Sequence, residues 1–202
     1  MGSIELMDQL DGLTVRVIAG SARGRRLIAP EGEVTRPTGD RVRESLFNML
    51  YSMGLPDQIS VLDLFAGSGA LGIEALSRGA AHATFVDIDR RAIDAINHNL
   101  SATGFTAQAT VESVTAERVI DQAITAGHRW GLALLDPPYA FDDWDLLLAK
   151  LPADAVVIES DRAIVAPPNW EVMRQRQYGT TIVVVLGSNL SAGRPTGMTP
   201  LE

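Results

Sequence analysis

The chain contains no cysteine, a single lysine and only three histidines among its 202 residues. The absence of cysteine excludes disulfides and thiolate metal sites. The histidines, His82, His98 and His128, lack the spacing of a metal-binding motif, so we expect no metal cofactor. The sequence also has no signal-peptide pattern and no apolar run of about 18 residues, the length that a membrane-spanning helix needs. These absences predict a cytoplasmic protein that does not enter a membrane.

Positive charge is scarce, with a formal net charge of −8, and it is unevenly distributed. Residues 14–43 contain seven of the 16 arginines and three acidic residues, which gives this window a charge of +4 and leaves −12 for the remainder. An acidic body with one basic end predicts a phosphate-rich partner at that end. The alternative is a solvated charge run. The candidate phosphate-binding residues are Arg23, Arg25, Arg26, Arg36, Arg41 and Arg43.

Residues 59–79 are the centre of the predicted fold. An apolar run over 61–65, long enough for one buried strand, leads into the small residues 66–69 and then into apolar residues at helical spacing. This order is typical of a nucleotide-cofactor site, because glycines let the backbone approach a ligand and a helix start offers free N–H groups. From Gly67 the sequence G-S-G-A-L-G formally matches the dinucleotide fingerprint. A tight turn that merely uses its glycines for shape is the alternative.

A second motif, Asp136-Pro137-Pro138-Tyr139, follows a predicted buried strand at 132–135. Because two prolines cannot continue a central strand, the chain must turn after Asp136. The turn presents a carboxylate, a carbonyl and an aromatic ring at the carboxyl end of the strand, where open α/β sheets bind ligands. The structural alternative is a rigid turn capped by the aspartate.

The tetrapeptide Asp136–Tyr139 resembles the motif of enzymes that methylate exocyclic amines of nucleobases or amide nitrogens. Such a base amine is a poor nucleophile, because its lone pair is delocalised into the ring. If Asp136 and the Pro137 carbonyl each accept one N–H, the nitrogen is drawn toward tetrahedral geometry, and Tyr139 offers a face on which the base can stack. The base must leave its helix or come from an unpaired loop. Asp136, Pro137 and Tyr139 are therefore the candidate catalytic residues.

Apolar periodicity predicts further elements on both sides of these motifs. We expect a hairpin over 14–30 that turns between Gly20 and Gly24, followed by a helix that ends at Gly54. Further strands are expected at 82–87, 107–111, 155–159, 171–178 and 180–186, and helices at 90–103, 115–126 and 142–150. The predicted division is a basic hairpin and helix over 14–54, a catalytic domain over 55–186, and a flexible tail over 187–202.

Acidic and polar residues after two of these strands are candidate cofactor ligands. Asp87 lies 18 residues after Gly69, close to the spacing at which an acid binds ribose hydroxyls. Ile88 beside it offers an apolar surface for an adenine ring or belongs to the core. Ser113, in the loop after the strand at 107–111, is the candidate for the adenine edge.

Five segments resemble the RsmD family of bacterial methyltransferases in order and spacing, over about 14–186: RVIAGSARGRRLIAP, TRPTGDRVRESLFNML, LDLFAGSGALGIEALSRGA, FVDIDRRAI and LLDPPY. The resemblance implies an α/β fold of the class I S-adenosylmethionine-dependent, Rossmann-like type. Its sheet would have seven strands, the last one antiparallel, and an N-terminal β-hairpin would be added. The implied reaction transfers a methyl group from S-adenosyl-L-methionine to a guanine N2 of small-subunit ribosomal RNA, free or in an assembled particle. We expect a monomer.

The resemblance also assigns roles around the glycine turn. The carboxylate of Asp63 would lie near the amino-acid end of the cofactor, and the turn would pass under its sugar. The candidate cofactor-binding residues are Asp63, Ala66, Gly67, Ser68, Gly69, Asp87, Ile88 and Ser113. Ser113 departs from the Asp or Asn that is common at its position, which leaves the adenine contact open.

Two other functions fit the same motifs. D-P-P-Y is shared with adenine and cytosine amine methylases, so the chain could methylate adenine N6 in DNA or RNA. Such DNA enzymes usually carry an additional recognition domain, for which 202 residues leave little room. The other alternative is a module that binds S-adenosylmethionine or RNA without catalysis. An intact D-P-P-Y disfavours this alternative, because binding alone does not need the carboxylate.

Overall fold

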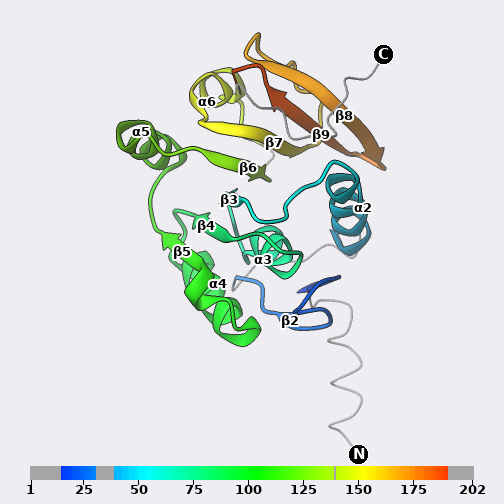
Figure 1. Ribbon diagram of the computed structural model, residues 1–202, viewed down its shortest axis with the longest axis vertical. Helices are drawn as coiled ribbons and strands as arrows, with labels where there is room; N and C mark the ends of the chain where they lie inside the picture. The colour runs from blue at the N-terminus through cyan, green and yellow to red at the C-terminus, as the bar shows by residue number, and fades with distance from the viewer. Residues whose placement is uncertain (1–14, 31–38, 139, 191–202) are drawn as a thin grey trace, which may run out of the picture.

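A seven-stranded mixed sheet is the framework of the molecule, for which a computed structural model describes residues 15–30, 39–138 and 140–190 (Figure 1). The strand order is β5-β4-β3-β6-β7-β9-β8. Strands β3 to β7 are mutually parallel where they pair, and β9 is antiparallel to both of its neighbours, β7 and β8. The strands are β3 (Ser60–Leu64), β4 (His82–Val86), β5 (Ala109–Glu112), β6 (Trp130–Leu135), β7 (Ala153–Ser160), β8 (Trp170–Tyr178) and β9 (Thr181–Ser188). This topology confirms the predicted fold.

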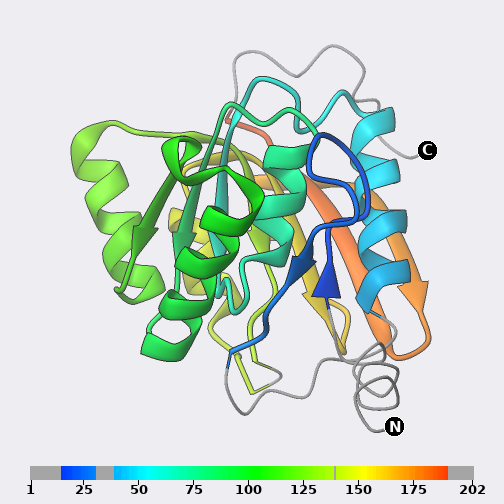
Figure 2. The ribbon, with the colours of Figure 1, turned by 90° about the horizontal axis from the view of Figure 1, so that it is seen from below.

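Helices cover both faces of the sheet, because successive residues of each strand point to opposite sides. Val61 belongs to the core cluster that contains residues of α2, α3 and α4, whereas its neighbour Leu62 belongs to the cluster with α5 and α6. Figure 2 shows the first group of helices and the hairpin in front of the sheet. The helices are α2 (Gly39–Ser52), α3 (Ala70–Ser77), α4 (Arg90–Thr103), α5 (Ala116–Ala126) and α6 (Trp144–Lys150).

The predicted N-terminal hairpin is present and packs on the body of the protein. Its strands β1 (Val15–Arg16) and β2 (Arg26–Leu27) pair antiparallel, and the turn between them uses Gly20 and Gly24 at φ +83°. The buried side chains Val17 and Leu27 join the same core cluster as α3 and α4. The hairpin therefore shares one core with the sheet and does not project freely from it.

Several element boundaries differ from the sequence prediction: β6 begins at Trp130, β7 spans Ala153–Ser160, and β9 extends to Ser188, two residues into the predicted tail over 187–202. Residues Thr106–Gln108 form a 3₁₀ turn (η1), so β5 begins at Ala109 and not at 107. Helix α6 begins at Trp144 and not at 142, because residues 140–143 form an irregular loop. All of these differences lie at element ends, which sequence patterns define least well. Among the described residues, no helix has the length and apolarity to cross a membrane.

Candidate active site

The pairing register of the parallel strands brings the two sequence motifs to one edge of the sheet. Leu64, the last residue of β3, is aligned with Leu135 of β6 on one side and with Val86 of β4 on the other. The residues that follow these strands therefore leave the same carboxyl edge next to one another. Because the chain connections diverge between β3 and β6, this edge is the topological switch point at which open α/β sheets bind ligands.

The glycine turn after β3 is held by an acid from the neighbouring strand. The backbone N–H of Gly67 donates to Oδ2 of Asp87 at 2.9 Å, and the N–H of Asp89 donates to Oδ1 at 2.9 Å. Gly67 has φ +54°, and a Cβ added there would meet no atom within 4 Å. The turn thus presents bare backbone on an open side, which is the kind of surface that a flat nucleotide cofactor requires.

Ile88 and Ser113 lie at the same edge. Ile88 follows Asp87 and is 72% exposed, so its side chain is not part of the core. Ser113 is exposed and follows β5, whose Glu112 is aligned with Val86 of β4. The candidate cofactor residues therefore form a row across the carboxyl ends of β3, β4 and β5.

Asp63 lies beneath this row, within the sheet. It is 2% exposed, and its Oδ2 accepts the backbone N–H of Gly72 at 2.8 Å. Burial raises the pKa of Asp63 to about 8; the Gly72 hydrogen bond opposes this, and the charges of Asp136 and Asp87 add to it. The carboxyl group is therefore largely protonated at neutral pH.

Gly72 is the third glycine of the fingerprint, and its role is close packing. A Cβ at this position would lie 2.3 Å from the ring of Phe85 and 3.0 Å from Oδ2 of Asp63. Any larger residue would push α3 away from β3 and β4. The glycine pattern thus sets the distance between helix and sheet as well as the shape of the turn.

The D-P-P-Y segment leaves β6 with Asp136 exposed and Pro137 buried. Tyr139 lies outside the described residues. Behind the segment, the Phe65 ring packs against Phe141, with centroids 5.2 Å apart, and Phe65 adopts φ +64°, an uncommon conformation for a residue other than glycine. Such strain occurs where surrounding structure imposes it, often at functional sites.

Arg162 fastens the loop that follows D-P-P-Y. Its Nη2 donates to the carbonyl of Phe141 at 2.7 Å and pairs with Oδ1 of Asp142 at 2.7 Å. Sequence reasoning missed Phe65, Phe141 and Arg162. Phe65 and Phe141 were detectable as aromatics directly beside the two motifs, but no local signal points to Arg162, which comes from the loop after β7.

The candidate phosphate-binding arginines are in different environments. Arg23, Arg25, Arg26 and Arg41 are exposed, and Arg36 lies outside the described residues. The side chain of Arg43 is only 8% exposed; its Nη2 donates to Oδ1 of Asp40 at 2.9 Å and to the carbonyl of Arg16. The pKa of Arg43 is lowered by burial, against the opposing charge of Asp40. Arg43 joins α2 to β1 and is therefore removed from the phosphate-binding set.

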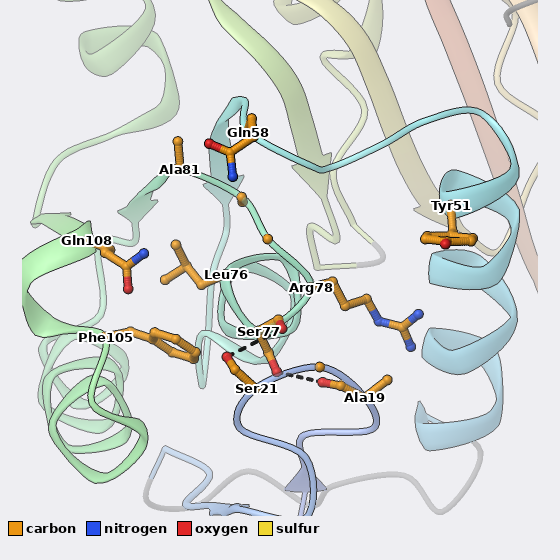
Figure 3. Close-up of a pocket in the computed structure, with 13 residues that line it drawn as sticks. Ala19, Ser21, Tyr51, Gln58, Leu76, Ser77, Arg78, Ala81, Phe105 and Gln108 are labelled. Carbon is orange, nitrogen blue, oxygen red and sulfur yellow. Dashed lines mark hydrogen bonds between the residues drawn. The ribbon is translucent and has the colours of Figure 1, made fainter.

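A pocket of about 770 Å³ lies on another part of the surface, where the hairpin turn meets the end of α3 (Figure 3). Oγ of Ser77 donates a hydrogen bond there to the carbonyl of Ala19, and Oγ of Ser21 donates to the carbonyl of Ser77. Tyr51 and Gln108 also line the pocket. The carbonyl end of α3 contributes a negative partial charge, which disfavours phosphate. The pocket contains none of the candidate catalytic or cofactor residues.

No group of three or more His, Asp or Glu with metal-binding geometry occurs in the described ranges.

Comparisons with known proteins agree with this architecture. The model of a family described as conserved hypothetical protein 95 matches residues 15–187. The chain is 36% identical over 179 residues to ribosomal RNA small subunit methyltransferase D of Escherichia coli K12, covering 82% of this chain and 85% of the relative. It is 35% identical over 175 residues to the Haemophilus influenzae protein of that name, covering 82% and 89%. A solved Escherichia coli structure superposes with a TM-score of 0.76 at 33% identity, covering 88% of this chain and 99% of that one.

Proposed function

The chain belongs to the conserved hypothetical protein 95 family, and from this membership and the site we propose that it methylates the exocyclic N2 of a guanine in small-subunit ribosomal RNA. Two relatives above 30% identity are named ribosomal RNA small subunit methyltransferase D, which supports ribosomal RNA methylation as the activity. The observation that carries the proposal is the alignment of β3, β4 and β6, which places the glycine turn, Asp87 and Asp136 at one edge. The resemblance to the RsmD family implies the family's target, guanosine-966, as the nucleotide to examine first.

The carboxyl edge suits S-adenosylmethionine, which supplies an activated methyl group on a sulfonium when it is bound. Asp87 is oriented by two backbone N–H groups and retains further lone pairs for the ribose hydroxyls. Ile88 offers an exposed apolar surface to the adenine ring, with Ser113 beside it. The turn formed by Ala66, Gly67, Ser68 and Gly69 lets the backbone approach the sugar, and Asp63 supports this turn from below through Gly72.

Asp136 and the carbonyl of Pro137 act on the substrate amine in this proposal. Each accepts one N–H, which localises the nitrogen lone pair and aims it at the methyl carbon. The nitrogen–carbon bond forms as the sulfur–carbon bond breaks, and the surplus proton of the amine passes to Asp136 and then to water. Tyr139 supplies the stacking surface. Holding the reacting atoms in line is the main contribution of such a site to rate.

Asp63 contributes little negative charge to this edge. Three carboxyl groups, Asp63, Asp87 and Asp136, lie close enough for the latter two to raise the pKa of the first. Because Asp63 is largely neutral at pH 7, it adds little negative charge beside Asp136. A neutral acid therefore supports the turn beneath the carboxylate that is proposed to contact the base.

The exposed arginines of the hairpin are proposed to bind the RNA backbone. Arg23, Arg25 and Arg26 lie on and beside the hairpin turn, and Arg41 lies at the start of α2. Arg36, between the two, belongs to the same proposed set. Phosphate contacts of this kind position the RNA without selecting its sequence.

The proposal is tested by incubating the protein with labelled S-adenosylmethionine and three acceptors: unmodified small-subunit particles, the corresponding naked RNA, and DNA. We expect label in the small-subunit RNA and N2-methylguanine in its nuclease digest by mass spectrometry. The comparison of particle with naked RNA identifies the preferred substrate form. N6-methyladenine, or label in DNA alone, would replace the guanine assignment with adenine methylation. Cofactor binding without any methyl transfer would support the alternative of a module that binds S-adenosylmethionine or RNA without catalysis.

A further inference from the structure

Asn99 of α4 joins the end of the hairpin to the glycine turn. The residue is fully buried, at 0% exposure. Its Nδ2 donates to the carbonyl of Ile28 at 2.9 Å and to the carbonyl of Ser68 at 2.8 Å, and its Oδ1 accepts the N–H of Ile28 at 2.9 Å. Ile28 directly follows β2, and Ser68 is in the middle of the turn 66–69. One side chain thus holds two segments that are 40 residues apart in the sequence.

The hydrogen bond to Ser68 constrains the peptide between Ser68 and Gly69. Gly69 follows Ser68 and has φ +76°, and the freedom of a glycine would let the peptide between them rotate. Donation by Asn99 directs the Ser68 carbonyl toward α4. The backbone surface that faces the cofactor is therefore fixed before the cofactor arrives, which lowers the entropy lost on binding.

The other contacts that hold the hairpin are of a different kind. Glu74 accepts the N–H groups of Ile18 and Ala19, at 2.7 and 3.0 Å, and Oγ of Ser77 accepts the N–H of Ala22 at 3.0 Å. These bonds join the hairpin to α3 near its turn end, and none of them involves residues 66–69. Ser77 therefore offers a matched control: it anchors the hairpin as Asn99 does, but its side chain forms no hydrogen bond with residues 66–69, all of which the structure describes.

We propose that Asn99 is a positioning residue that couples RNA bound at the hairpin to the cofactor bound at the glycine turn. The inference rests on the proposed RNA-methylating function. Arg26 precedes Ile28 by two residues, so phosphate contacts that order β2 also order the backbone that Asn99 holds. RNA binding then tightens cofactor binding, and by linkage the cofactor tightens RNA binding by the same factor.

The test measures the affinity for S-adenosylhomocysteine by calorimetry, with and without transcribed small-subunit RNA, in the wild type, Asn99→Ala and Ser77→Ala. For the wild type, RNA should raise the affinity by about fivefold or more, the lower end of typical coupling. Asn99→Ala should bind S-adenosylhomocysteine about tenfold more weakly without RNA and show no increase with RNA. Ser77→Ala should retain wild-type affinity in the absence of RNA. Circular dichroism confirms folding, and Asn99→Ser, which keeps one polar atom, replaces Asn99→Ala if the latter does not fold.

Unchanged affinity and coupling in the Asn99 variant would overturn the inference. An equal loss of affinity without RNA in Ser77→Ala would overturn it as well, because it would indicate general loosening of the hairpin. Wild-type protein that transfers methyl groups to RNA but shows no coupling would also overturn it, while leaving the proposed function intact. Wild-type protein without RNA methylation would defeat the proposed function, and the affinities without RNA would still decide whether Asn99 positions the turn.

Discussion

The carboxylate of Asp87 accepts the backbone N–H of Gly67 at 2.9 Å, so the acid at the end of β4 holds the turn at the end of β3. Asp87 therefore has two roles, because the carboxylate that is proposed to accept hydrogen bonds from the ribose hydroxyls also holds the glycine turn in shape. A substitution at Asp87 therefore removes a ligand group and a support of the cofactor site together.

Replacing Asp87 by alanine should weaken S-adenosylmethionine binding by about 2–4 kcal/mol, through loss of two charge-assisted hydrogen bonds to the ribose and of the support at Gly67. Isothermal calorimetry measures the change. Asp94→Ala, an exposed acid on α4, is the control for the loss of one negative charge. Equal affinity for S-adenosylmethionine in the Asp87 and Asp94 variants would show that Asp87 has only a surface role and does not bind the cofactor.

Asp136→Ala should lower the rate of methyl transfer by about 10²–10³, the usual cost of removing one preorganised acceptor. Its affinity for S-adenosylmethionine should stay close to wild type, because the proposed partner of Asp136 is the substrate amine. Single-turnover kinetics with saturating cofactor measure the rate, and calorimetry measures the affinity. Turnover near the wild-type value would contradict the proposed chemistry.

Asp63 should make stability depend on pH. Its pKa is raised from 3.8 to about 8 by folding, so its stabilising contribution is fully present below pH 3.8 and is lost as the pH rises to about 8. Between these values the wild type should lose about 1.4 kcal/mol of unfolding free energy per pH unit relative to Asp63→Asn, which cannot ionise but can still accept the Gly72 N–H. Urea unfolding at several pH values compares the two. Parallel pH profiles would show that Asp63 is ionised in the folded protein.

The hairpin arginines should contribute to RNA affinity through phosphates. Replacing Arg23, Arg25 and Arg26 by alanine should weaken RNA binding and reduce the slope of log affinity against log salt by about 2, at 0.7–0.9 for each lost contact. Cofactor affinity measured without RNA should not change. Arg118 and Arg176, exposed elsewhere, form the control pair. Weaker binding with an unaltered slope would mean that the arginines shape the hairpin or stack on bases.

Arg162→Ala should slow methyl transfer by about tenfold without changing cofactor affinity, because the loop beyond D-P-P-Y loses its link to Arg162 and small misplacements of reacting groups are costly. The neighbouring exposed residue provides the matched control Asp161→Ala. Thermal unfolding should differ little between the two variants, since surface substitutions usually change stability by less than about 0.5 kcal/mol. Wild-type kinetics in Arg162→Ala would show that the loop is held by its aromatic contacts alone.

The strand–turn–helix at 59–79 and the D-P-P-Y turn were predictable from local patterns, because glycine conformation, proline geometry and apolar periodicity act over a few neighbouring residues. The seven-stranded topology followed from resemblance to a known family. The boundaries of β5 and α6 were less well predicted, since the residues there suit turns and helix starts alike.

Contacts between distant segments were beyond local patterns. Arg43 has the sequence context of a phosphate ligand, yet α2 packs against β1 so that Arg43 is buried beside Asp40 and the carbonyl of Arg16. In the sequence, Asn99 is one polar residue of an amphipathic helix. Its role becomes visible only in the folded protein, where it contacts Ile28, 71 residues away, and Ser68, 31 residues away. Burial and hydrogen-bond partners arise only when the chain packs. The motifs at 59–79 and 136–139, on which the proposed chemistry depends, could therefore be recognised in the sequence, whereas the contacts of Arg43 and Asn99 were determined by the packing of the hairpin, α2 and α4 against the sheet.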